Sequence, residues 1–256
     1  MDIRVCCPSY KRPIVETFDY LPWVKVYVDP KEYDEYIKKN PGKNIVKCAD
    51  GVQGNISRVR NHILDKEFED GAEAVLIIDD DFKGLFYWEN KKSIPVEPEE
   101  FLLFVEKYTL LCLEWGYKIW GVNINQDKQV YREYSPFSTT SFIGAPFTVT
   151  LKGSECRYDE EISLKEDYDM TLQQLNKYRG ALRVNKFYYK VKQAEQTGGC
   201  ATYRNLDKEI QQLDALQKKR GDKIVKKDEG KSRSHNSTKV RKFDINPIIQ
   251  APIKGI

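Results

Sequence analysis

Short apolar segments alternate with segments of helical spacing through the first half of the chain. The apolar segments predict strands at residues 3–7, 24–28, 45–48 and 75–78. Helical patterns fall between them, at residues 31–39 and 56–68. This alternation predicts an α/β fold with a mostly parallel central sheet flanked by helices. Such sheets bind ligands at the carboxyl ends of their strands, so the loops after the first, second and fourth strands should converge on one crevice.

The second half of the chain has longer helical patterns and less regular strands. Helices are predicted at residues 99–115, 164–178 and 206–219, and strands at 118–123 and 184–191. Residues 131–160 are rich in Tyr, Phe, Ser, Thr, Pro and Gly, which predicts irregular structure with short strands. With 256 residues, the chain has the length of one compact α/β domain or of two tightly packed lobes.

Composition argues against a membrane protein and against a disulfide scaffold. No apolar run approaches the roughly 20 residues needed to cross a bilayer, so no membrane partner is expected. The chain enters its first strand without a basic and apolar leader, which favours a cytoplasmic protein. The six cysteines form no Cys-x-x-Cys pair and lie mostly among apolar residues. They are expected to be reduced core thiols rather than disulfides or zinc ligands.

Three adjacent carboxylates, Asp79, Asp80 and Asp81, follow directly on the apolar run at 75–78, and we call them the aspartate cluster. They repel one another unless they are solvated, hydrogen-bonded or neutralised by a cation, and hard oxygen ligands select Mg²⁺ or Mn²⁺. In an extended segment Asp79 and Asp81 point the same way and Asp80 points the opposite way. An acidic turn after a strand is the alternative, as is a calcium loop, although the EF-hand pattern is missing.

A second candidate site is the loop that precedes the helix predicted at 56–68. Gly51 and Gly54 permit close backbone approach, and Arg58 lies near the start of the helix. A helix N-terminus with an arginine beside it can bind an anion, but ordinary loop-to-helix chemistry explains the same residues.

A third candidate is the pair Glu166 and Asp167, at the start of the helix predicted at 164–178. Carboxylates are favoured at this position by the helix dipole, so capping alone accounts for them. The functional alternative makes one of them a general base that removes a proton from an acceptor hydroxyl. The residues by themselves do not choose between these interpretations.

Positive charge is concentrated near the end of the chain. The net charge is only +3, but residues 218–242 contain eleven Lys and Arg and three acidic residues, which leaves +8 locally. We call these residues the basic segment. It can meet a polyanion such as a diphosphate, a nucleic acid or both. The alternative is a solvated tail that is partly disordered.

Several motifs resemble those of known glycosyltransferases. The PSYKRP loop at residues 8–13, the aspartate cluster and the YDE…EDYD pattern at 158–169 resemble, in this order, nucleotide-diphospho-sugar transferases of the GT-A fold. This similarity covers most of residues 1–190. Four further motifs resemble the TET-associated glycosyltransferases of bacteriophages and their relatives: QGNISRVRN at 53–61, WGVN at 120–123, YREYSPF at 131–137 and GGCATYR at 198–204.

The resemblance implies a metal-dependent glycosyltransferase with a GT-A fold. The donor would be a UDP-sugar, the transferred group a hexosyl or N-acetylhexosaminyl unit, and the outcome inversion. The favoured acceptor is 5-hydroxymethylcytosine in phage DNA, in the host cytoplasm if the chain is phage-encoded. Enzymes that modify a base in duplex DNA generally extrude it, and the basic segment would hold the DNA backbone. A glycan or protein acceptor, and a noncatalytic nucleic-acid-binding module, are the alternatives.

The resemblance also implies roles for individual residues of one domain, 1–256. Residues 1–123 would bind the sugar nucleotide, 124–205 the acceptor, and 206–256 would form a helix and a basic tail. Donor contacts are expected from Pro8, Ser9, Tyr10, Arg12, Asp29, Gln53, Arg58, Asp79, Asp80, Lys239 and Arg241.

Metal binding and catalysis are assigned in the same way. Asp81 and Asp79 would bind Mn²⁺ or Mg²⁺, with Asp79 shared with the ribose, and His235 would be a late histidine ligand. Asp167 would be the catalytic base, with Glu166 beside it. Asp80 is expected to face away and to bind Arg58 or backbone amides.

Overall fold

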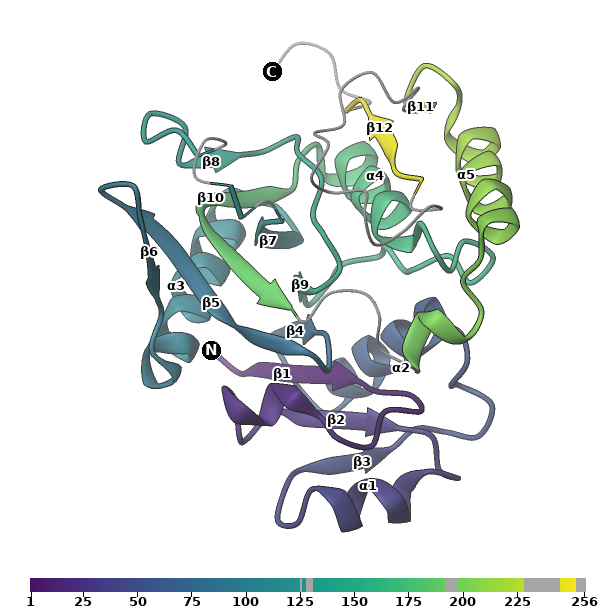
Figure 1. The fold of residues 1–256 in the computed structure, drawn as a ribbon. Coiled ribbons are helices and arrows are strands. Elements are labelled where there is room, and N and C mark those ends of the chain that lie inside the picture. The colour runs from purple at the N-terminus through teal and green to yellow at the C-terminus, as the bar shows by residue number, and fades with distance from the viewer. Residues whose placement is uncertain (125, 128–130, 192–197, 228–244, 252–256) are drawn as a thin grey trace.

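The fold is described from a computed structural model that covers residues 1–124, 126–127, 131–191, 198–227 and 245–251. Its centre is a mixed sheet with the strand order β3-β2-β1-β4-β9-β7-β10-β5-β6, in which β8 also pairs with β10 (Figure 1). The strands are β1 (Ile3–Pro8), β2 (Lys25–Val28), β3 (Ile45–Lys47), β4 (Ala74–Ile78), β5 (Phe82–Glu89), β6 (Lys92–Pro95), β7 (Ile119–Asn123), β8 (Phe137–Ser138), β9 (Phe147–Leu151) and β10 (Leu182–Val191).

Helices cover both faces of this sheet. They are α1 (Tyr33–Lys39), α2 (Ile56–Glu69), α3 (Phe101–Glu114), α4 (Glu166–Tyr178) and α5 (Leu206–Arg220), with short 3₁₀ turns η1 (Glu16–Asp19), η2 (Pro98–Glu100) and η3 (Gly199–Thr202). Side chains of α1 and α3 pack into one hydrophobic cluster, and those of α2, α4 and α5 pack into another. A separate pair of strands, β11 (Val225–Lys227) and β12 (Pro247–Ile249), packs beside α5 (Figure 1).

The predicted α/β fold is confirmed, and the sheet is parallel where strands alternate with helices. Strands β1 to β4 are parallel neighbours, as are β7 and β10. The remaining pairs, including those of β9 with β4 and β7, are antiparallel. The sheet is therefore mixed rather than mostly parallel, because β9 runs antiparallel to both of its neighbours and β5, β6 and β8 join by antiparallel pairing.

The β5–β6 hairpin was not expected from the sequence. Its two-residue turn consists of Asn90 and Lys91, with φ of +48° and +62°. Positive φ at both central residues belongs to the turn that matches the twist of a tight hairpin. Asn favours this conformation, but Lys does not, and the absence of a glycine conceals the turn.

Five of the six cysteines are buried, as expected of core thiols, and Cys200 is half-buried; all six are free. In the part of the chain that the structure describes, no helix has both the length and the apolar character needed to span a bilayer.

Candidate active site

The candidate site lies at the carboxyl ends of β1 and β4, which are neighbours in the sheet. Strands β2 and β3 follow β1 on one side of it, whereas β4 lies on its other side. The direction in which strands are added to the sheet therefore reverses between β1 and β4. Open α/β sheets bind ligands at such a point. The loop at residues 8–13 and the aspartate cluster follow these two strands and therefore lie side by side.

Asp80 joins these two loops. The residue is only 5% exposed; its carboxylate accepts a hydrogen bond from Ser9 Oγ at 2.6 Å and forms an ion pair with the guanidinium of Arg12. The hydroxyls of Ser9 and Tyr36 are also hydrogen-bonded, at 2.9 Å. The expectation that Asp80 binds Arg58 or backbone amides was wrong, because the polar loop after β1 already supplies its partners.

Other residues that were expected to contact the sugar-nucleotide donor lie in the loop at residues 8–13 or against it. Pro8 ends β1 and is buried, and Gln53 Nε2 donates to the carbonyl oxygens of Ser9 and Tyr27 at 3.3 Å. The carbonyl oxygen of Tyr10 accepts from the backbone N–H of Gly199 at 2.8 Å.

Gly198, just before η3, permits this close approach of the chain. It has φ +97°, and a Cβ there would lie 2.6 Å from the carbonyl oxygen of Lys11. The GGCATYR motif is therefore packed against the loop after β1. Asp29, by contrast, follows the neighbouring strand β2, and its carboxylate accepts from the N–H of Lys31 at 2.9 Å.

Arg60, and not Arg58, lies beside the aspartate cluster. The Arg58 side chain is 42% exposed and pairs with Glu160 at 3.0 Å, so it is not the partner of Asp80, and its expected contact with the sugar-nucleotide donor stays a prediction. The Arg60 side chain is 3% exposed, and its guanidinium lies 2.6 Å from Glu166 Oε1 and 3.6 Å from Asp79 Oδ1. Arg60 thus connects the carboxylates after β4 with those at the start of α4.

The helical periodicity of residues 56–68 could have identified Arg60 as a buried residue. The buried positions of α2 include Arg60, Ile63, Leu64 and Glu67, which is the i, i+3, i+4, i+7 stripe of an amphipathic helix. A charged residue on the buried stripe needs a buried partner of opposite charge. The partner, Glu166, is 106 residues away in sequence, and the helix pattern carries no information about it.

Glu166 and Asp167 differ in their surroundings, although both begin α4 as predicted. Glu166 is 7% exposed and held by Arg60. Asp167 is partly exposed, and its carboxylate accepts from the N–H of Tyr168 at 2.8 Å. The Tyr168 ring stacks on Phe142 at 4.1 Å. Of the two carboxylates, Asp167 is the one that remains accessible.

Burial raises the pKa of every carboxyl group in this site. The pKa of Asp80 rises to about 6, and that of Asp81 rises to about 7 because the charges of Asp79 and Asp80 add to the effect of burial. Burial also raises the pKa of Glu166 to about 7. For Asp79 and Asp167 the direction is the same, and Arg60 opposes it. Negative charge here exceeds what the neighbouring arginines neutralise, which favours binding of a cation.

The carboxylate oxygens of Asp79 and Asp81 are suitable ligands for Mn²⁺ or Mg²⁺ that is bound together with a diphosphate. Asp79 is 33% exposed, and Asp81 is half-buried. Among the described residues, no three His, Cys, Asp or Glu side chains form a group that could hold a metal. Mg²⁺ is commonly bound by one or two carboxylates plus substrate phosphates, which matches this arrangement. His235, Lys239 and Arg241 lie outside the described residues, and their roles stay predictions.

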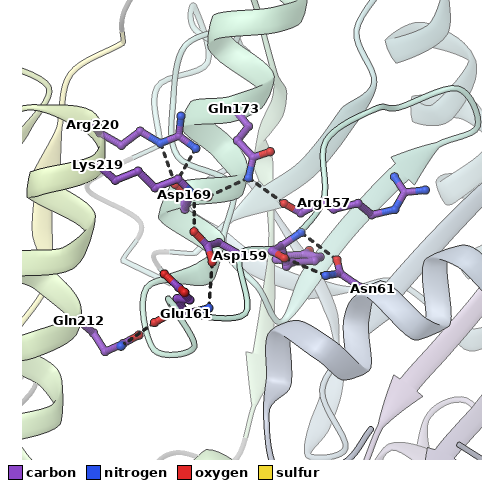
Figure 2. Close-up of polar contacts among 10 residues, drawn as sticks. Asn61, Arg157, Asp159, Glu161, Asp169, Gln173, Gln212, Lys219 and Arg220 are labelled. Atoms are coloured by element: carbon purple, nitrogen blue, oxygen red, sulfur yellow. Dashed lines mark hydrogen bonds and ion pairs between the residues drawn. The ribbon is translucent and has the colours of Figure 1, made fainter. Parts of the chain in front are cut away.

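The helix α5 fixes the loop that leads into α4 (Figure 2). Arg220 contacts the fully buried carboxylate of Asp169 at 2.7 Å, and Lys219 contacts it at 3.1 Å while also pairing with Asp159. Gln212 donates to the carbonyl oxygen of Glu161 at 2.9 Å. The position of Glu166 and Asp167 is therefore set from the α5 side as well as by Arg60.

The helix α2 holds the same loop from the other side. Asn61 Nδ2 donates to the carbonyl oxygen of Tyr158, and the N–H of Tyr158 donates back to Asn61 Oδ1, both at 2.8 Å (Figure 2). This reciprocal pair places the loop next to the buried Arg60, whose guanidinium lies 5.4 Å from the centre of the Tyr158 ring.

Comparison with known families agrees with this geometry. The family model for TET-associated glycosyltransferases matches residues 19–199, which is more than half of the chain. The chain belongs to this family. The resemblance seen in the sequence is thereby confirmed. The region of this TET-associated glycosyltransferase that the family model matches contains the aspartate cluster, Arg60, Glu166 and Asp167, whereas the loop at 8–13 and α5 lie outside it.

Solved structures with similar architecture are more distant. One is S. aureus TarS 1-349 in complex with UDP-GlcNAc, with 15% identity, a TM-score of 0.48, and coverage of 84% of this chain and 65% of that chain. Another is glucosyl-3-phosphoglycerate synthase from Mycobacterium tuberculosis with Mn²⁺, UDP and glucosyl-3-phosphoglycerate, with 11% identity, a TM-score of 0.49, and coverage of 89% and 84%. The TET-associated glycosyltransferase chain spans 59% to 65% of the TarS structures. Among curated proteins, none matches it.

Proposed function

We propose that this protein transfers a sugar from a UDP-sugar to a hydroxyl group, with 5-hydroxymethylcytosine in DNA as the favoured acceptor. The observation that carries the proposal is the position of Arg60, which holds Asp79 on one side and Glu166 on the other. The aspartate cluster, which is suited to binding a metal and a diphosphate, thus adjoins Glu166 and Asp167, which are suited to activating the acceptor hydroxyl. A glycosyl transfer needs both groups at one reaction centre.

The different surroundings of Glu166 and Asp167 support different roles for them. The buried ion pair with Arg60 makes Glu166 a positioning residue. Asp167 takes the proton of the acceptor hydroxyl as the hydroxyl oxygen attacks the anomeric carbon of the sugar. The bond between that carbon and the diphosphate oxygen breaks, and the nucleoside diphosphate leaves with the electron pair. Attack opposite to the leaving group inverts the anomeric centre.

Asp81 and Asp79 hold the divalent metal in this proposal. When held there, the ion would neutralise the charge that develops on the leaving diphosphate. Asp80 keeps the loop at residues 8–13 against the cluster through Ser9 and Arg12, where the nucleoside half of the donor would lie. Lys239 and Arg241 are proposed to contact the diphosphate, and His235 to complete the metal site.

The assignment of DNA as acceptor rests on the family, whose name links it to TET enzymes, and on the charge of the basic segment, in which Lys219, Arg220 and Lys227 already pair with carboxylates of the chain. The test incubates the full chain with Mn²⁺, a panel of UDP-sugars and DNA that contains 5-hydroxymethylcytosine. Mass spectrometry of the digested nucleosides should show a gain of one sugar. A panel without any such gain, alongside transfer to a glycan or protein hydroxyl, would overturn the DNA assignment.

Asp81→Asn should raise the Mn²⁺ concentration needed for half-maximal transfer at least about tenfold, because it removes one of two carboxylate ligands. Glu69→Gln is the matched control, since Glu69 is an exposed acid at the end of α2. DNA binding by the Asp81→Asn variant should stay at the wild-type level. Wild-type protein that binds DNA but releases no UDP with any donor would indicate a noncatalytic binding module.

Transfer should depend on pH through Asp167. The base acts only when ionised, and burial raises its pKa above the ordinary value of 3.8. Below that raised pKa, kcat/KM is expected to fall about tenfold for each pH unit. The measurement is kcat/KM at saturating Mn²⁺ from neutral pH downward, with DNA binding followed in parallel as the control. A value of kcat/KM that stays constant down to the ordinary carboxylate pKa would contradict the assignment.

A further inference from the structure

A pocket lies away from the aspartate cluster, between the turn of the β5–β6 hairpin and the loop before β8. Its volume is about 770 Å³. The hairpin contributes Trp88, Asn90 and Lys91, and the loop contributes residues 131–134. These two segments come together at the edge of the molecule where β6 ends the sheet (Figure 1).

Aromatic rings of this pocket are available for stacking. Tyr134 is 85% exposed, an unusual position for an aromatic side chain with no packing role in the core. Trp88 is half-buried, and its indole N–H has no hydrogen-bond partner in the described part of the chain. One face of Trp88 stacks on Tyr188 at 5.0 Å, and Tyr188 stacks on Phe86 at 5.7 Å. The stack gives the pocket a rigid wall.

Cations accompany these rings. Among the described residues that line the pocket are two cations, Lys91 and Arg132, and one carboxylate, Glu133. Along the adjoining strand β10, the ammonium of Lys190 lies 3.8 Å from the centre of the Phe86 ring, which is on the same face of β5 as Trp88. Stacking platforms combined with cations are the features by which proteins hold strands of nucleic acid. A neutral glycan would use the rings but would not require the cations.

The pocket is too far from the reaction centre to hold the acceptor base itself. Trp88 lies seven residue steps beyond Asp81 along β5, which corresponds to about 23 Å of extended strand. One strand of duplex DNA advances about 3.4 Å per nucleotide, so roughly seven nucleotides cover this distance.

We propose that this pocket binds a nucleotide of the acceptor DNA about seven positions from the base that receives the sugar. A base or sugar of that nucleotide packs against Trp88 and Tyr134, and its phosphate contacts Lys91 and Arg132. The inference rests on the proposed DNA acceptor, because it assigns the surface that holds the flanking strand. The pocket thereby lengthens the DNA site beyond the reacting base and favours acceptors that extend on this side.

The test compares Tyr134→Ala with wild type on fluorescein-labelled DNA of two lengths, by fluorescence anisotropy and without sugar donor. Oligonucleotides of about 20 nucleotides reach both sites, and those of about five reach only the reaction centre. Tyr134→Ala should weaken binding of the long DNA about tenfold and leave that of the short DNA unchanged. Trp23→Ala is the control, because Trp23 is 41% exposed just before the amino end of β2, away from the pocket.

A second measurement isolates the cations. Lys91→Gln and Arg132→Gln should each lower the slope of log affinity against log salt by about one on the long DNA only. Lys38→Gln, on the exposed face of α1, should leave the slope unchanged. The thermal melting temperature of each variant is recorded to establish that it folds.

Equal effects of Tyr134→Ala on both lengths, or no effect on either, would overturn the inference. So would a similar loss of binding to a neutral oligosaccharide. Sugar transfer by wild-type protein to the long DNA, with the panel of UDP-sugars and Mn²⁺, is scored separately. A length-dependent loss of binding without transfer refutes the proposed activity and leaves the DNA pocket standing, whereas transfer with no effect of Tyr134→Ala refutes the pocket alone.

Discussion

Replacing Asp167 with Asn is expected to lower the rate constant of sugar transfer by about 10²- to 10⁴-fold, the range that a general base contributes. The amide cannot accept the proton of the acceptor hydroxyl, but it has nearly the same shape and can still accept from the N–H of Tyr168. The fold and the binding of donor and acceptor should therefore remain. Single-turnover transfer, with binding of UDP and DNA measured on the same samples, checks both parts.

Glu166→Gln provides the contrasting variant on the same turn of α4. It removes the charge that neutralises the buried Arg60, so it should lower the free energy of unfolding as well as the transfer rate. A general base shows the opposite pattern, with loss of rate at unchanged stability. If Asp167→Asn retains transfer within tenfold of wild type while Glu166→Gln abolishes it at wild-type stability, then Glu166 is the base.

Local pattern was sufficient to locate the two carboxylate groups of the site. An apolar run that ends in three aspartates predicts a strand end, and β4 ends at Ile78 immediately before them. The helix that begins with Glu166 was likewise predicted from its spacing, to within two residues at its start. Both features depend on neighbours in sequence, and strand and helix periodicity report on such neighbours directly.

Contacts between residues that are far apart in sequence could not be predicted from local pattern. Arg58 and Arg60 are two residues apart on α2, and only the packing of α4 against α2 decides which of them meets a carboxylate. The β5–β6 hairpin was missed for a different reason, because Lys91 adopts a positive φ that lysine seldom takes. The basic segment beyond residue 227, with His235, Lys239 and Arg241, lies outside the described residues, and its contribution to the site stays a prediction.

Replacing Arg60 with Met is expected to lower the free energy of unfolding by about 3–5 kcal/mol. The change leaves Glu166 buried without its cation, and breaking a buried ion pair from one side has a cost of this size. Asp79 loses the same neighbour but is 33% exposed and 3.6 Å away, so it adds less. Urea unfolding at neutral pH in metal-free buffer measures the effect.

Arg58→Met is a control on the same helix with the same change of side chain. Its ion pair with Glu160 joins side chains that are 42% and 47% exposed, and such a pair contributes about 1 kcal/mol or less. Similar losses for the two variants would contradict the view that Arg60 is the buried link of the site.

The double variant Arg60→Met with Glu166→Leu separates stability from function. Apolar replacement of both members of a buried ion pair is often neutral or stabilising, so most of the lost stability should return. Sugar transfer should not return, because the stable double variant lacks the charged Arg60 side chain that links Asp79 to the start of α4, where Asp167 lies. Recovery of both would mean that Arg60 and Glu166 serve the core alone. Recovery of stability without transfer would mean that the ion pair is kept for the geometry of the reaction centre.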